Sequence, residues 1–158
     1  MLFRSLLNKG IRVSLPFPPN GSVNKLGLYF RSTKGWVFQT ARPDSDAKYI
    51  STEIDRTLGD VALLQDTEPP SFGLLRVYPR YGKPYISFRY YDNLSGIDTD
   101  EIKMYIDDKQ VIPEIDGERR YVWFQAEQRL ELGKHTLVLA MKDRMNNEST
   151  LTRAFTIR

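Results

Sequence analysis

The chain has 158 residues, a length that fits one large domain or two small ones. Its 23 Lys and Arg residues nearly balance its 20 Asp and Glu residues and are interspersed with them, whereas nucleic-acid binders concentrate positive charge on one segment or face. The absence of cysteine excludes disulfides, zinc–thiolate sites and thiol nucleophiles. No window approaches the ~20 apolar residues of a membrane-spanning helix. We therefore expect neither a nucleic-acid partner nor a membrane span.

The first part of the chain is expected to be a small β-sandwich module over residues 11–66. Residues 1–10 are left unassigned, and they lack the apolar core of about 7–15 residues that marks a secretory signal. From Ile11 onward, apolar and polar residues alternate with the period of two that is typical of strands. Turn-rich breaks separate five expected strands, at residues 11–15, 25–31, 36–40, 49–55 and 61–65.

A connector between two modules is expected at Asp66 to Pro70, because two consecutive prolines fix φ and donate no hydrogen bonds. Seven further strands are predicted after it, at residues 73–78, 85–91, 102–107, 110–113, 120–125, 135–142 and 151–157. Seven short strands at this spacing are typical of an immunoglobulin-like sandwich. The sequence therefore predicts an all-β fold with two β-sandwich modules in tandem, the second of them, residues 67–158, immunoglobulin-like with about seven strands.

Alternation also predicts which side chains face the core of the second module. Trp123 is expected on the outer face or at the junction with the first half, and Tyr85, Ser87 and Arg89 are expected to point outward. The residues expected to point inward are Ile86, Phe88, Tyr90, Val122, Phe124, Leu137, Leu139 and Met141.

Five short motifs resemble those of bacterial immunoglobulin-like modules. They are Asp-x-x-Pro-Pro at 66–70, Asp-x-x-Ser-Gly-Ile-Asp at 92–98, Gly-x-His-x-Leu at 133–137, Asp143 to Asn147, and Phe-x-Ile at 155–157. They occur in order and at suitable spacing over residues 66–158. Asn146 replaces the glycine of the final turn, a mild departure because Asn also tolerates a left-handed turn.

The first half is similar to the small β-module that precedes such domains in envelope proteins. Its resembling features are Leu26 to Tyr29, Gly35-Trp36 and Leu58 to Leu64, leading into Asp66. Together the two halves resemble the non-catalytic C-terminal region of peptidoglycan-cutting metallopeptidases of the cell envelope. The resemblance implies a periplasmic or extracellular location, with an export signal upstream of this chain.

Catalysis is not expected. His135 is the single histidine, and a zinc peptidase needs three protein ligands, usually including two histidines. A Ser–His–Asp triad would require a preformed geometry that no pattern here indicates. His135 opens an expected strand, where an imidazole ring more often packs at a sandwich corner. We expect no cofactor.

Five acidic residues on loops could in principle converge on calcium, which prefers six to eight oxygen ligands. They are Asp92, Asp98, Asp100, Glu101 and Asp143. The interpretation we favour is turn chemistry, in which Asp92 and Asp143 cap tight turns while Gly96 and Asn147 supply unusual backbone dihedrals. No metal site is therefore predicted.

One stretch, from Ser71 to Tyr91, contains cations and aromatic residues but no acid. Such interleaving can hold a glycan or a single nucleic-acid strand, although charged strand faces are usually only solvated. The ligand surface predicted from it comprises Arg76, Tyr78, Arg80, Tyr81, Tyr85 and Arg89.

These observations predict a non-catalytic structural or interaction module of a larger bacterial envelope or secreted protein. Its expected role is to space or dock a partner, which is either another domain of the same parent protein or an envelope protein. The alternative is a carbohydrate-binding module that holds peptidoglycan or another glycan on strands 76–91.

Overall fold

The computed structural model describes residues 9–17, 24–43, 48–54, 59–80 and 83–158, and every element in them is a β-strand. The all-β fold predicted from alternation is therefore confirmed. None of these residues forms a helix that is long and apolar enough to cross a membrane. The chain divides into two compact units, Met1–Thr67 and Glu68–Arg158, and the division falls within the proline-rich connector.

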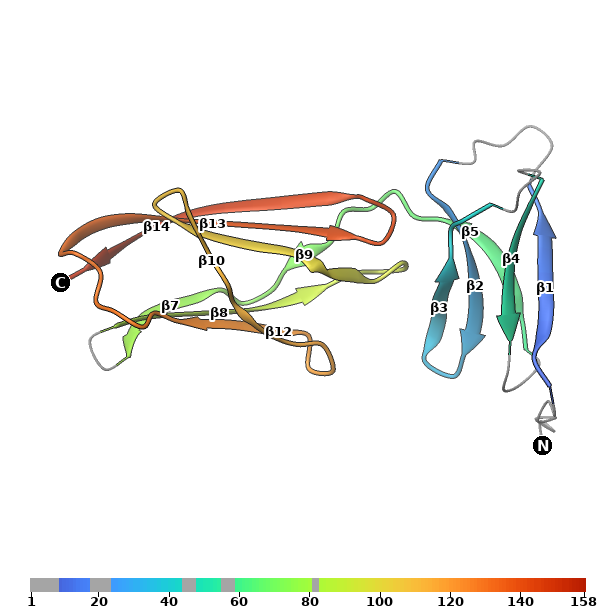
Figure 1. Cartoon of the computed structure of the whole chain (residues 1–158), viewed down its shortest axis with the longest axis horizontal. Helices are drawn as coiled ribbons and strands as arrows, with labels where there is room; N and C mark the ends of the chain where they lie inside the picture. Colours follow the sequence, from blue (N-terminus) through green and yellow to red (C-terminus); the bar gives the residue numbers. More distant parts are fainter. Residues whose placement is uncertain (1–8, 18–23, 44–47, 55–58, 81–82) are drawn as a thin grey trace. The chain divides into compact units, whose positions relative to one another are not determined.

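The first unit contains two small antiparallel sheets (Figure 1). One pairs β1 (Ile11–Pro16) with β4 (Tyr49–Ile54). The other has the order β3-β2-β5, from Gly35–Thr40, Leu26–Ser32 and Val61–Gln65. The buried apolar side chains come from the central strand β2 and from β4 and are Leu26, Leu28, Tyr29, Ile50 and Ile54. Two sheets that share a buried core are what the sequence predicts for this half.

The second unit is a sandwich of two antiparallel sheets, drawn as two layers in Figure 1. One sheet has the order β11-β12-β8, with β6 and β7 both pairing with β8. Its strands are β6 (Ser71–Phe72), β7 (Arg76–Arg80), β8 (Lys83–Tyr91), β11 (Glu114–Asp116) and β12 (Tyr121–Gln125). The other sheet has the order β10-β9-β13-β14. Its strands are β9 (Ile97–Ile106), β10 (Lys109–Val111), β13 (Gly133–Asp143) and β14 (Glu148–Ile157).

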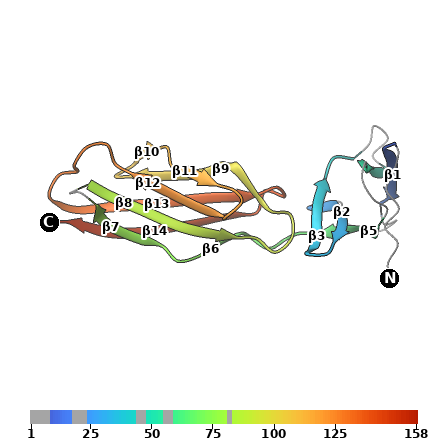
Figure 2. The ribbon, with the colours of Figure 1, turned by 90° about the horizontal axis from the view of Figure 1, so that it is seen from below.

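The core of this unit lies between the two layers, which Figure 2 shows from below. The predicted inward residues of β8, β12 and β13 belong to it, because each central strand turns every second side chain toward the core. They are Ile86, Phe88, Tyr90, Val122, Leu137, Leu139 and Met141, with Phe124 packed against them. The predicted register of all three strands is therefore confirmed.

The predicted strand at 73–78 is correct only from Arg76, where β7 begins, because the chain breaks between β6 and β7 at residues 73–75. Gly73 donates its backbone N–H to the Arg89 carbonyl at 2.7 Å and lies so close to β8 that an added Cβ would be 2.7 Å from the Tyr91 ring. This close approach needs glycine at position 73, and the pairing of β6 with β8 ends there. The chain then pairs with β8 again from Arg76.

Two other differences lie in the segment between β9 and β12. Asp107 and Asp108 both adopt positive φ, 49° and 63°, and form a two-residue hairpin loop between β9 and β10. The strand β10 therefore starts at Lys109. The sequence also misses β11, whose three residues are too short to show an alternation. With these changes, the described part of the second unit has nine strands where seven are predicted.

Candidate functional site

On the outer side of the sheet β7-β8-β12-β11, side chains from β7, β8 and β12 lie next to one another. Tyr78 lies opposite Tyr85, and Arg76 lies opposite Ser87. On the other side of β8, Trp123 lies opposite Ser87 and Tyr121 opposite Arg89. Residues paired in this way point to the same face, since neighbouring strands share their pleat. We call this set of residues, together with Arg80, the outer face.

Two ring contacts organise the outer face. Tyr121 and Trp123 stack with ring centroids 5.8 Å apart and planes only 22° from parallel. Tyr78 and Tyr85 contact each other at 5.1 Å with their planes tilted by 41°. Tyr78 is 44% exposed, and Tyr121 and Trp123 are partly exposed. The stacked Tyr121–Trp123 pair therefore exposes aromatic ring surface to solvent, and a third exposed ring, that of Tyr78, lies two strands away.

Tyr85 supports this surface from below. It points outward but is only 8% exposed, because neighbouring side chains cover it. Its hydroxyl lies 3.2 Å from the hydroxyl of Tyr121, and the Arg80 guanidinium lies over its ring at 5.4 Å. Burial, followed by this hydrogen bond, raises the pKa of Tyr85 to about 12. The hydrogen bond therefore joins two protonated phenols at neutral pH, and either hydroxyl can donate it.

The electrostatics of the outer face are uneven. Burial alone would raise the pKa of Tyr121, but hydrogen bonds from Ser87 and Tyr85 and the charges of Arg76 and Arg89 lower it. The guanidinium groups thus impose a positive potential on the ring surface. The acids that share this face, Glu114 and Asp116, are both on β11 at the far edge, and Asp116 already contacts Arg119 at 3.7 Å.

The structure places most of the predicted ligand surface together. Arg76, Tyr78, Arg80 and Arg89 are exposed on the outer face, whereas Tyr85 is on it but covered. Tyr81 lies outside the described residues. Tyr90, in the same acid-free stretch, is buried in the core.

Sequence reasoning missed Tyr121 and Trp123 as members of the site. Both alternate outward along β12, and β12 pairs directly with β8. The signal that could have found them is the strand order of an immunoglobulin-like sandwich, in which the fifth strand lies beside the second.

His135 is buried at the start of β13 and has both ring nitrogens engaged. Nδ1 lies 2.6 Å from the Asp107 carboxylate and Nε2 lies 2.8 Å from the Glu131 carbonyl oxygen. Both partners are acceptors, so the arrangement fits an imidazolium that donates twice. Hydrogen bonding to Asp107 and then to Glu131 raises the pKa of His135. The ring also stacks on Phe155 at 5.4 Å, which is the corner packing that the sequence predicts.

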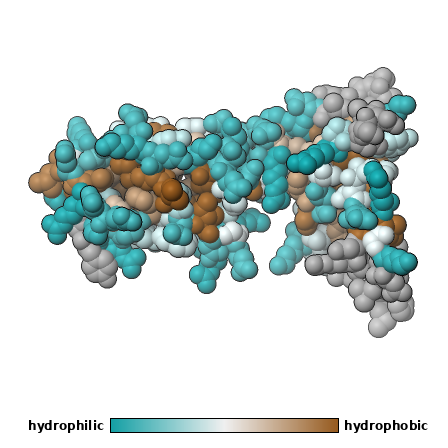
Figure 3. Space-filling model, in the orientation of Figure 1, coloured by the Kyte–Doolittle hydropathy of each residue, from teal (hydrophilic) through white to brown (hydrophobic). Residues whose placement is uncertain are grey.

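A cavity of about 500 Å³ adjoins His135 and is walled partly by Phe124 and Val111. Figure 3 shows apolar side chains gathered over β10, at the edge between the two layers. Lys109, Asp107, Arg129 and Glu131 also line the cavity, so both signs of charge meet at its mouth. This mixture indicates no single class of ligand.

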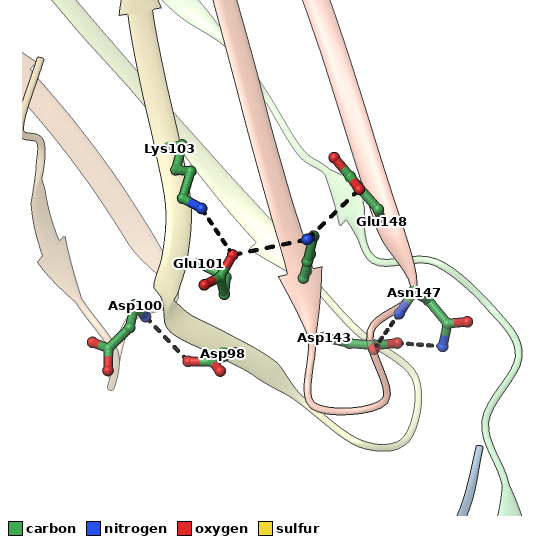
Figure 4. A network of polar contacts seen from close by, with 8 residues as sticks. Asp98, Asp100, Glu101, Lys103, Asp143, Asn147 and Glu148 are labelled. Carbon is green, nitrogen blue, oxygen red and sulfur yellow. Dashed lines mark hydrogen bonds and ion pairs between the residues drawn. The ribbon is translucent and has the colours of Figure 1, made fainter. Parts of the chain in front are cut away.

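The candidate calcium residues make turns in the described structure. Asp92 accepts hydrogen bonds from the backbone N–H groups of Leu94 and Gly96, at 3.1 and 2.6 Å. Asp143 accepts from the N–H groups of Met145 and Asn147, both at 2.8 Å, and from the Asn147 side chain at 2.6 Å (Figure 4).

The other acids of this set have local partners as well. The backbone N–H of Asp100 donates to Asp98 at 3.2 Å, and Glu101 forms an ion pair with Lys103 at 3.0 Å (Figure 4). The left-handed residue of the final turn is Asn146, with φ of 60°, which is the position that the motif gives to glycine. Asn147, which the turn interpretation expects to supply an unusual dihedral, has no positive φ. Gly96 has the predicted positive φ, 78°.

No family model matches this chain, and no match was found among curated proteins.

Proposed function

We propose that the chain is a non-catalytic interaction module of a larger cell-envelope protein and that it binds a glycan through the outer face. The observation that carries the proposal is the stacked Tyr121–Trp123 pair, with Tyr78 exposed across the sheet. Sugar rings present polarised C–H groups, which are attracted to the negative face of an aromatic ring. Adjacent rings on a rigid sheet provide such contacts at little cost in entropy.

A non-catalytic role is supported by the state of His135. Both of its nitrogens are hydrogen-bonded to acceptors, so the ring has no free lone pair with which to act as a base or a metal ligand. The single histidine therefore serves the packing of the sandwich in this proposal. The module's role is to space or dock a partner domain of the parent protein while the outer face binds its ligand.

An immunoglobulin-like assignment of the second unit supports the envelope location. The sheet orders β7-β8-β12-β11 and β10-β9-β13-β14 correspond to the orders A-B-E-D and C′-C-F-G of such sandwiches. The motifs at 66–98 and 133–157 resemble bacterial modules of this kind. Peptidoglycan is then the first glycan to test.

The test is co-sedimentation of the whole chain with purified peptidoglycan sacculi, together with a glycan array. We expect binding that Trp123→Ala weakens by tenfold or more, because the stacked pair is broken. Trp36→Ala, the same change in the first unit, is the matched control and should bind as the wild type does. If the wild type bound no glycan in either assay, or if both variants bound normally, the proposal would be overturned.

A further inference from the structure

We infer that the ligand of the outer face is an anionic glycan, with its acid groups over the cations of β7 and β8 and its sugar rings over Tyr121 and Trp123. This inference rests on the proposed function and adds the charge of the ligand. It follows from how the sheet distributes charge among its strands.

The cationic side chains of β7 and β8 on the outer face all lie on one side of the stacked rings of Tyr121 and Trp123. They are Arg76, Arg80, Lys83 and Arg89, and no acid occurs between Ser71 and Tyr91. No carboxylate among the described residues forms an ion pair with Arg76, Lys83 or Arg89. The positive charge of these three side chains is therefore not neutralised by a carboxylate of the described residues.

The acids of the same face are too distant to compensate it. Glu114 and Asp116 are on β11, three strands from β7. Strands lie about 4.8 Å apart, so β11 is about 14 Å from β7 and about 10 Å from β8. Both separations exceed the screening length of about 8 Å at physiological salt. A bound anion above β7 and β8 would experience the cations and little of the acids.

The spacing of the side chains favours an extended ligand. Alternate residues on a strand are about 6.8 Å apart, so Arg76 and Arg80 are about 13 Å apart along β7 with the exposed ring of Tyr78 between them. A guanidinium group donates to a carboxylate or sulfate in a fixed fork geometry. Arg89 uses one nitrogen to donate to the Arg119 carbonyl at 3.4 Å, which fixes the group and leaves other donors available.

A single nucleic-acid strand is the competing occupant, since it too combines rings with negative charge. The acidic edge at Glu114 and Asp116 argues against it, because a nucleic-acid strand crossing the sheet would carry a phosphate at every step. A glycan with acid groups on only some sugars fits a face that is cationic on one side and acidic on the other.

Isothermal titration calorimetry of the whole chain can separate these ligands. The probes are a partly methyl-esterified oligogalacturonide, in which only some sugars carry carboxylates, its fully methyl-esterified form, which is neutral, and a single-stranded oligonucleotide of similar length. We expect the acidic oligomer to bind at least tenfold more tightly than its ester, and its affinity to fall as NaCl is raised from about 0.05 to 0.5 M.

Variants then locate the effect. Arg76→Gln and Arg89→Gln should each lower the affinity for the acidic oligomer about tenfold, the usual consequence of losing a hydrogen bond to a charged group. Their affinity for the ester should not change. Lys109→Gln, the same loss of charge in the opposite sheet, should bind as the wild type does.

Equal affinity for the acidic and esterified oligomers would overturn the inference and leave the proposed function standing. Binding of neither oligomer would overturn the inference as well, and the sacculi and array results would then decide the proposed function alone. Oligonucleotide binding as tight as that of the acidic glycan would replace the glycan by nucleic acid.

Discussion

The hydroxyl oxygens of Tyr85 and Tyr121 lie 3.2 Å apart, although Tyr121 pairs across the strands with Arg89, four residues along β8. The two side chains therefore reach toward each other along the sheet and close over Ser87, which is only 2% exposed. This contact joins the covered ring of Tyr85 to the exposed stacked pair. It shows that the outer face has an organised layer of side chains and is not merely solvated.

Removing the Tyr85 hydroxyl tests this layer. Tyr85→Phe keeps the ring and its contacts with Tyr78 and Arg80 but removes the hydrogen bond between the hydroxyl groups of Tyr85 and Tyr121. We expect a loss of about 1 kcal/mol in the free energy of unfolding, the usual net value of one hydrogen bond. Urea denaturation measures it. Tyr78→Phe, whose exposed hydroxyl makes no hydrogen bond to the described residues, should change stability by much less, and an equal loss in both would argue against the contact.

The two neighbouring aromatic residues of β12 should separate stability from binding. Phe124 packs against the core and Trp123 stacks on the outer face. Phe124→Ala is expected to cost about 3 kcal/mol of unfolding free energy, because a large apolar side chain leaves a cavity. Trp123→Ala should cost less and should weaken glycan binding by tenfold or more. Thermal melts and sacculi binding check both variants, and the reverse ranking of stability would contradict the register of β12.

The ion pair of His135 and Asp107 predicts how stability depends on pH. Folding raises the pKa of His135 through its hydrogen bonds to Asp107 and Glu131. The stability that His135 contributes is therefore complete below its unfolded pKa of about 6.5, and it is lost as the pH rises through the folded pKa. Hydrogen bonds from His135 and Thr136 lower the pKa of Asp107 in the folded protein. The stability that Asp107 contributes is therefore present above its unfolded pKa of about 3.9, and it is lost as the pH falls through the folded pKa.

The pair therefore stabilises the fold most between about pH 4 and 6.5. His135→Gln should flatten the decline in unfolding free energy on the alkaline side, measured by urea titration from pH 5 to 9. Because the chain has one histidine, NMR can also follow its titration directly. A folded-state pKa at or below 6.5 would refute the imidazolium assignment.

Asp143 should be the most important of the loop acids for stability. It is 1% exposed and accepts three hydrogen bonds. Asp143→Ala leaves buried donors without an acceptor, and each such loss costs about 1–3 kcal/mol, so we expect at least about 3 kcal/mol in total. Asp98→Ala, which removes one longer hydrogen bond at 3.2 Å, is the matched control. A loss below 1 kcal/mol for Asp143→Ala would show that the turn does not depend on it.

The sequence predicts the parts of this fold that local alternation determines. Ile86, Phe88 and Tyr90 are assigned correctly because β8 is a central strand with one buried face. The break after Phe72 is not predictable in this way, since it depends on Gly73 meeting the Tyr91 ring, a contact between two different strands. The strand β11 is missed because three residues cannot show a period.

The candidate site also has one part that local sequence predicts and one part that depends on contacts between distant strands. The part on β7 and β8 is predictable, because these strands form a hairpin and are contiguous in the sequence. The half on β12 comes from residues more than thirty positions later, and only the strand order brings Tyr121 and Trp123 beside Arg89 and Ser87. The burial of Tyr85 also depends on its neighbour β12, so it could not be predicted from the outward position of Tyr85 alone.

The most direct test of the outer face as a ligand site is an NMR titration of the whole chain with the acidic oligogalacturonide, observed at the tryptophan indole N–H groups. The chain has two tryptophans, Trp123 on the outer face and Trp36 on β3, so each spectrum contains its own control. We predict that the Trp123 signal shifts with saturation while the Trp36 signal stays in place. A titration that shifts Trp36 alone, or neither signal, would contradict it.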